Sequence, residues 1–133
     1  MDKVKVSDKL LLSVEKPARY TGGELNSIVK ETARLRFALC FPDVYEIGMS
    51  HLGSRILYEV INSREEYACE RCFAPWPDME KAMRENNVPM FTLETRTPLA
   101  ECDIVGFSLL YEMCYTNILT MLDLAHIHKR SAD

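Results

Sequence analysis

The amino-acid sequence predicts an α/β domain with an open, mostly parallel sheet of about four strands and helices on both of its faces. Two observations predict this class. Short apolar segments bounded by Pro, Asp or Asn alternate with segments whose apolar residues recur at helical spacing. The length of 133 residues suits one compact domain with a single core. Such alternation is typical of parallel sheets, because consecutive parallel strands need a crossover between them.

Four segments have the length and boundaries of buried strands. The first is stopped by Pro42-Asp43, and the last, which contains Val105 and Phe107, is the most hydrophobic of the set. The predicted strands span residues 36–41, 67–74, 90–94 and 103–109.

Three segments show helical periodicity. The first begins near Ser50, and its apolar residues fall on one helical face; they are Leu52, Ile56, Leu57, Val60 and Ile61. The second, 78–86, is short and charged, with Met79, Ala82 and Met83 predicted to face inward. The third is a long helix over 111–127.

Residues 1–34 are predicted to form an N-terminal arm, and residues 35–133 the α/β domain. Pro17 and the Gly22-Gly23 pair interrupt the backbone too strongly for a long helix in the arm. The sequence therefore predicts an ordered arm or loop there, and periodicity says nothing of its role.

Charge and cysteine content exclude several classes of function. The net charge of −4 argues against nucleic-acid binding, which needs clustered Lys and Arg. The sequence has no signal peptide and no apolar run near the ~20 residues that a membrane-spanning helix needs. The five cysteines are odd in number and lie mostly in apolar runs, as reduced thiols do. We therefore expect a cytoplasmic protein that binds neither nucleic acid nor membrane.

The strand ends hold the candidate site. In an open parallel sheet, ligands bind outside the carboxyl ends of the strands, where the direction of winding reverses. If the first and fourth strands are neighbours, a crevice lies between residues 41–48 and 108–115. The first loop carries Asp43, Tyr45, Glu46 and Gly48, and a glycine permits close approach of a cofactor. The alternative is an ordinary strand-to-helix turn in which Asp43 or Ser50 caps the helix.

Further side chains near the crevice have two interpretations each. Glu46 and Glu112 could face each other for acid–base work, or bond to loop amides. Tyr111 and Tyr115 lie one helical turn apart and could flank a planar ligand or join the core. Trp76, between two prolines, is either an anchor for another domain or a lid over the second helix.

Two metal-type patterns are interpreted as structural. Cys69 and Cys72 have metal-site spacing, but a second pair of ligands is missing from the sequence, so chance placement on a strand is favoured. His51, three residues beyond Gly48, could be a metal ligand, but a neutral polar residue in the first turn of a helix is favoured. We predict no catalytic and no metal-binding residues in this chain.

The strand-end residues resemble two known families. Asp43-x-Tyr45-x-x-Gly48 has the spacing of the Asp-x-His-x-x-Gly signature of cobalamin-binding domains, and 105–110 resembles the later strand with its Ser-x-Leu. The segments 16–20, 41–50 and 105–108, extended by 115–117, are similar to the N-terminal region of an uncharacterised group of radical SAM proteins.

This resemblance implies a truncated, cobalamin-binding-like Rossmann fold. It implies that Asp43 and Tyr45 lie near the lower face of a corrin, that Gly48 lets the backbone approach, and that Ser108 and Leu110 line the pocket of the nucleotide tail. Glu46 and Glu112 complete the predicted cofactor-binding set. Tyr45 stands where the signature has its cobalt-binding histidine, so cobalamin would bind without a protein imidazole.

The resemblance also implies a longer parent protein. The Gly-Gly strand of cobalamin domains and the three-cysteine motif of radical SAM enzymes are absent from these 133 residues. We therefore expect the 4Fe-4S cluster and S-adenosylmethionine in a downstream radical SAM domain of the same chain, which this domain would cover. An exposed sheet edge would permit a homodimer.

Two other functions stay open. The fold could be a vestigial packing domain with an empty crevice. It could also be a small flavodoxin-like enzyme that uses Glu46 and Glu112, although no nucleophile with an evident base is present in the sequence.

Overall fold

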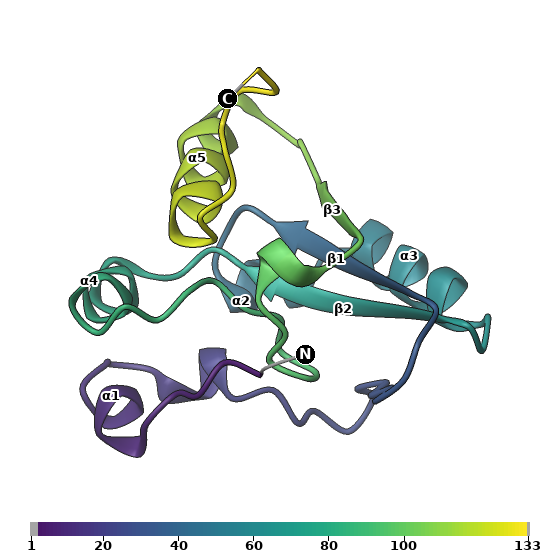
Figure 1. The fold of residues 1–133 in the computed structure, drawn as a ribbon, viewed down its shortest axis with the longest axis horizontal. Helices are drawn as coiled ribbons and strands as arrows, with labels where there is room; N and C mark the ends of the chain where they lie inside the picture. Colours follow the sequence, from purple (N-terminus) through teal and green to yellow (C-terminus); the bar gives the residue numbers. More distant parts are fainter. Residues whose placement is uncertain (1–2, 133) are drawn as a thin grey trace.

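A computed structural model describes residues 3–132 of the chain as a parallel sheet between two layers of helices (Figure 1). The helices are α1 (Asp8–Leu12), α2 (Tyr45–Met49), α3 (Leu52–Asn62), α4 (Pro77–Glu85) and α5 (Tyr115–Leu124). The strands are β1 (Leu35–Phe41), β2 (Tyr67–Phe73) and β3 (Ile104–Phe107), and the 3-10 turns are η1 (Pro17–Tyr20), η2 (Leu99–Glu101) and η3 (Glu112–Cys114). None of the helices between residues 3 and 132 is long and apolar enough to cross a membrane.

The sheet of the described residues has three strands in the order β2-β1-β3, and both pairings are parallel. Cys40 of the central strand lies opposite Cys72 on one side and Phe107 on the other. The chain passes from β1 outward to β2 and then returns across β1 to β3. The direction of winding therefore reverses between β1 and β3, as the predicted site requires.

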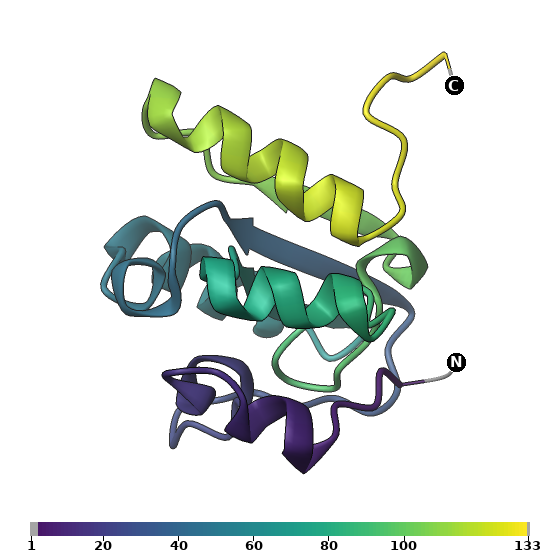
Figure 2. The same ribbon diagram turned by 90° about the vertical axis from the view of Figure 1, so that its left-hand side faces the viewer.

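Helices cover both faces, which confirms the predicted fold class. On one face α4 and α5 pack on the sheet, and α1 continues this layer (Figure 2). Met79, Met83 and Met121 are completely buried there against Ala38 and Cys40 of β1. On the other face α3 contributes Tyr58 and Ile61, which pack on Leu39 and Cys69.

The segment 90–94 is where the strand prediction differs from the structure. Only one isolated antiparallel bridge forms there, between Phe91 and Pro98. β2 is an edge strand, and this segment covers its open edge: the Leu93 amide donates to the carbonyl of Arg71 at 2.9 Å. The carboxylate of Glu94 then accepts from the Arg71 amide at 2.8 Å. A side chain thus takes the place of a backbone ladder partner, so the sheet has three strands rather than about four.

Helix α3 turns an unexpected face to the sheet. Tyr58 and Asn62 are buried, whereas Leu52, Ile56 and Val60 are 65, 53 and 60% exposed. The Asn62 amide group bonds both the amide and the carbonyl of Cys69, at 2.9 and 3.0 Å. Because these bonds satisfy backbone groups of the β2 edge, polar anchoring fixes the rotation of the helix.

The arm is packed on the domain. Four of its apolar side chains and Tyr20 join the core beneath the sheet; the four are Val4, Val6, Leu10 and Val14. Lys30 donates to three backbone carbonyls at the end of α3 and the start of β2, at 2.6 to 2.8 Å. The arm thus belongs to the same compact unit as residues 35–132.

A buried ion pair holds the sheet to the turn that follows α4. The side chain of Glu70 on β2 is 1% exposed and pairs with Arg36 of β1. Its second oxygen accepts from the amide of Thr95 at 2.8 Å and from the hydroxyls of Thr92 and Thr95. One carboxylate therefore links β1, β2 and the turn that covers the β2 edge.

We predict that Glu70→Gln lowers the free energy of unfolding by about 3–5 kcal/mol, because it leaves the Arg36 guanidinium buried without a counter-charge. Urea denaturation followed by circular dichroism measures the change. The matched control is Glu85→Gln, an exposed carboxylate of α4, with an expected change within about 0.5 kcal/mol. Equal effects of the two substitutions would contradict the structural role of Glu70.

Candidate functional site

The carboxyl ends of β1 and β3 meet at one edge of the sheet, as predicted. The Ser108 amide donates to the carbonyl of Cys40 at 3.1 Å, which continues the pairing one residue beyond β3. Past the strands, the hydroxyl of Tyr111 donates to Asp43 Oδ2 at 2.9 Å, and Asn117 Nδ2 donates to the carbonyl of Pro42 at 2.9 Å. We call Asp43, Ser108, Tyr111 and Asn117 the strand-tip site.

Asp43 bonds both to its own loop and across the crevice. Its Oδ1 accepts from the Val44 amide at 2.8 Å, while Oδ2 bonds Tyr111. The bond to Asp43 raises the pKa of Tyr111 to about 12, because the phenolate would lie beside a carboxylate. The alternative, in which Asp43 or Ser50 caps the helix, is not what the structure has: α2 has no side-chain cap, and His51 caps α3.

Tyr45 and Glu46 bond to the arm. The Tyr45 hydroxyl donates to Glu24 Oε1 at 2.5 Å, and burial together with this bond raises the pKa of Tyr45 to about 12. Glu46 accepts two bonds from Arg19 Nε at 2.9 and 3.0 Å, and this pairing lowers the pKa of Glu46. The structure therefore engages both side chains with residues 19–24, a contact that sequence reasoning missed.

The other predicted residues have separate environments. Gly48 is buried, and a Cβ there would overlap the ring of Phe73 and lie 3.2 Å from Phe41. Ser108 is half-buried, Leu110 is exposed, and Glu112 lies exposed in η3. The packing of Gly48 against aromatic rings explains its lack of a side chain without any ligand.

A small cavity of about 210 Å³ adjoins the strand-tip site. It lies between the Asp43-Val44 loop, the end of β2 and helices α4 and α5, with Trp76 and Asn117 in its lining. Trp76 is 46% exposed, and the guanidinium of Arg19 lies 5.2 Å from its ring centroid. The arm thus reaches the wall of this cavity.

Cys69, Cys72 and His51, which are candidate metal ligands by sequence, have packing and capping roles in the structure. Cys69 and Cys72 point to opposite faces of β2, one packing with α3 and the other with the α4–α5 core. His51 caps α3, because its Nδ1 accepts from the Ser54 amide at 3.1 Å. In residues 3–132 no three metal-ligating side chains of His, Cys, Asp or Glu come together.

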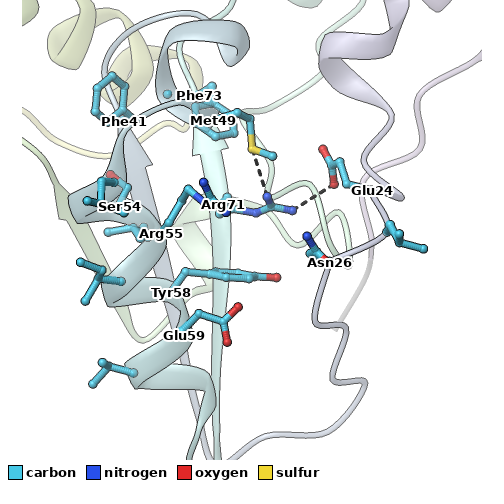
Figure 3. A pocket seen from close by; sticks show the side chains of 16 residues that line it. Glu24, Asn26, Phe41, Met49, Ser54, Arg55, Tyr58, Glu59, Arg71 and Phe73 are labelled. Atoms are coloured by element: carbon cyan, nitrogen blue, oxygen red, sulfur yellow. Dashed lines mark hydrogen bonds and ion pairs between the residues drawn. The ribbon is translucent and has the colours of Figure 1, made fainter.

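A larger cavity of about 500 Å³ lies on the α3 face of the sheet, and sequence reasoning missed it (Figure 3). Its floor carries Arg71, which pairs with Glu94 and Glu24. The one signal in the sequence is the charged pair Glu70-Arg71 inside a segment that otherwise has the pattern of a buried strand. Spacing along the chain does not reveal the carboxylates that Arg71 meets.

Comparison with known families adds the decisive observation. The model of the family described as "Radical SAM proteins, N-terminal" matches residues 53–133, more than half of the chain. The chain belongs to this family. The matched region of this radical SAM N-terminal domain includes Ser108, Tyr111 and Asn117, and the 43–48 loop precedes it. A search of curated proteins found no match, and neither did a search of solved structures.

We predict that Gly48→Ala lowers the free energy of unfolding of the radical SAM N-terminal domain by about 1–3 kcal/mol, because the added methyl overpacks the site against Phe73. Thermal and urea unfolding measure it. The control is Glu59→Ala, at an exposed side chain of α3, with an expected change within about 0.5 kcal/mol. A Gly48→Ala protein of unchanged stability would remove the packing explanation.

Proposed function

We propose that this domain is a non-catalytic part of a radical SAM protein. In this proposal its strand-tip edge covers the radical SAM domain of the same chain, and a cofactor binds between the two. The observation that carries the proposal is the meeting of the β1 and β3 ends at the point where winding reverses, with Asp43 bonded to Tyr111 across it. The family description, which places the matched region at the N-terminus of radical SAM proteins, supports the choice of partner.

Exposed apolar side chains beside the strand-tip site support a covering role. Leu109, Leu110 and Tyr111 are 60, 51 and 45% exposed, and Met113 and Tyr115 are 78 and 54% exposed. Aromatic residues and methionine are enriched in the cores of protein interfaces. β3 also forms an edge of the sheet, with backbone groups open to another chain segment. Self-association of the domain would use this same surface.

Cobalamin is the cofactor that we propose to test at this edge. Asp43 and Ser108 would line the side of the site that this chain supplies, and Leu110 would contribute an apolar contact. Position 45, where the signature has its histidine, is a tyrosine, and its hydroxyl donates to Glu24. The proposed cobalamin would therefore have no protein imidazole from this position. The adjoining cavity of about 210 Å³ is smaller than the ~300–1,000 Å³ of typical ligand sites. A corrin would therefore need the radical SAM domain to complete the site.

The 4Fe-4S cluster and S-adenosylmethionine are assigned in this proposal to the radical SAM domain. The three-cysteine motif is absent from the 133 residues, and the role of the present domain would be to bind and to exclude water. In the alternative, the domain only packs on its partner and the crevice binds nothing.

The test is a titration of the longer protein with hydroxocobalamin, followed by its visible spectrum and by thermal unfolding. We expect a spectral change and, at 100 times the dissociation constant, a stabilisation of about 2.7 kcal/mol. Asp43→Ala and Ser108→Ala should weaken binding at least tenfold, because each removes a polar contact. Asp8→Ala on α1, far along the chain from the site, is the control.

Experiments on the same longer protein distinguish the cofactor-binding role from the covering role. If neither spectrum nor stability changes, the cofactor role fails. The covering role then depends on a second pair of substitutions, Leu110→Asp and Met113→Asp, which should speed proteolysis between the two domains. Unchanged proteolysis would contradict the covering role as well.

A further inference from the structure

The cavity on the α3 face is a separate feature from the strand-tip site. It is bounded by α2 and α3, by the face of β1 and β2, and by arm residues 24–26 (Figure 3). None of its lining residues is Asp43, Ser108, Tyr111 or Asn117. Its volume of about 500 Å³ falls in the range of ~300–1,000 Å³ that is usual for small-molecule sites.

The walls of the cavity are mostly apolar. Phe41 and Phe73 line its upper end in Figure 3. Leu39 of β1 is also part of its lining. Leu52, Ile56 and Val60 line it from α3, and Leu25, which is fully exposed, lines it from the arm. The apolar side chains of α3 that are not buried against the sheet are therefore the ones that line this cavity.

The floor of the cavity carries the guanidinium of Arg71, whose charge is already paired with two carboxylates. Arg71 Nε donates to Glu94 Oε1 at 2.6 Å, and Nη2 donates to Glu24 Oε2 at 3.0 Å. The Glu94 side chain is completely buried and also accepts from the Tyr58 hydroxyl at 3.1 Å. The guanidinium lies 4.7 Å from the centroid of the Tyr58 ring. Burial opposes ionisation of Glu24, but bonds from Tyr45 and Ser27 and the charge of Arg71 lower the pKa of Glu24 to about 2.

One donor of Arg71 is poorly satisfied. Nη1 bonds the sulfur of Met49 at 3.0 Å, and a thioether is a weak acceptor. A ligand oxygen at this point would be a stronger acceptor than the sulfur, and it would meet the cationic side of the floor. The guanidinium thus offers one directed hydrogen bond to an occupant of the cavity.

Charge complementarity selects an uncharged occupant. Arg71 is paired with two carboxylates, so an anionic ligand beside it would also lie near Glu24 and Glu94. A cationic ligand would find both carboxylates already bonded to donors of the protein. Burying an unpaired charge is costly. Arg55 and Glu59 of α3 also line the cavity, but both are exposed and their charges are opposite. Apolar walls around a floor with one weakly satisfied donor favour a neutral, mainly apolar molecule.

We propose that this cavity binds a small, uncharged, mostly apolar molecule, aromatic or branched, whose single carbonyl or hydroxyl oxygen accepts a hydrogen bond from Arg71 Nη1. The volume, the apolar walls and the weakly satisfied Arg71 donor on the floor carry this inference together. It does not depend on the function proposed for the strand-tip site, since the two sites share none of their residues.

The probe is 6-propionyl-2-dimethylaminonaphthalene, an uncharged naphthalene ketone whose emission shifts to the blue in apolar surroundings. Titration of the 133-residue chain should give a saturable blue shift. The analogue 2-dimethylaminonaphthalene, which lacks the carbonyl, should compete about tenfold more weakly, because it leaves the Arg71 donor with the sulfur alone.

Substitutions on the exposed wall locate the probe. Leu52→Asp and Ile56→Asp, at side chains that are 65 and 53% exposed, should each raise the dissociation constant at least tenfold while the urea midpoint stays unchanged. Met113→Asp and Leu119→Asp, at side chains that are 78 and 48% exposed outside the cavity, are matched controls and should change it less than twofold.

Three results would overturn the proposal. The first is the lack of a saturable shift. The second is equal weakening by the control substitutions, which would move the probe to the surface around Met113 and Leu119. The third is self-association that Leu52→Asp abolishes in sedimentation, because a second copy of the chain would then cover the cavity. Binding of hydroxocobalamin by the longer protein is unaffected by each of these results.

Discussion

The parallel pairing of β1 with both of its neighbours is the constraint on which the rest of the structure depends. Parallel neighbours cannot be joined by a hairpin, so the chain must cross over the sheet between β1 and β2 and again between β2 and β3. Because the first crossover leaves β1 toward one side and the second returns past β1 to its other side, the loops after β1 and β3 emerge side by side. The bond between Asp43 and Tyr111 is the direct consequence.

The edge strand β2 organises the two faces. Its consecutive residues Glu70 and Arg71 point to opposite sides of the sheet, as neighbours on a strand do. Glu70 holds the turn that contains Thr92 and Thr95, and Arg71 pairs with Glu94 of the same turn. One short segment thereby closes the edge of β2 and supplies Glu94, a counter-charge of the arginine on the floor of the cavity beneath α3. Two polar anchors on one strand explain why that segment is a turn and not a further strand.

Much of this fold could be predicted from the sequence. The apolar runs that became β1, β2 and β3 have clear boundaries, and the inward residues of α4 follow from helical spacing. The rotation of α3 could not be predicted, because it depends on bonds from Asn62 to Cys69 across the β2 edge and from Tyr58 to the arm. Helical periodicity predicts that the apolar stripe of α3 packs on the sheet, whereas in the structure Leu52, Ile56 and Val60 of that stripe line a cavity.

The site was predictable in position but not in detail. The meeting of the two strand tips follows from topology. The engagement of Tyr45 by Glu24 and of Glu46 by Arg19 does not, because the arm has no periodic pattern and its partners lie more than twenty residues away. The packing of Gly48 on Phe73 likewise required coordinates.

The most direct test of this account is a nuclear Overhauser spectrum of the isotope-labelled chain. Parallel pairing of β1 with β3 predicts contacts from the Ser108 amide to Cys40 and Phe41, and from the Tyr111 ring to Asp43. Contacts of Phe107 with residues 90–94 in place of β1, or no contact between the two strand tips, would contradict it.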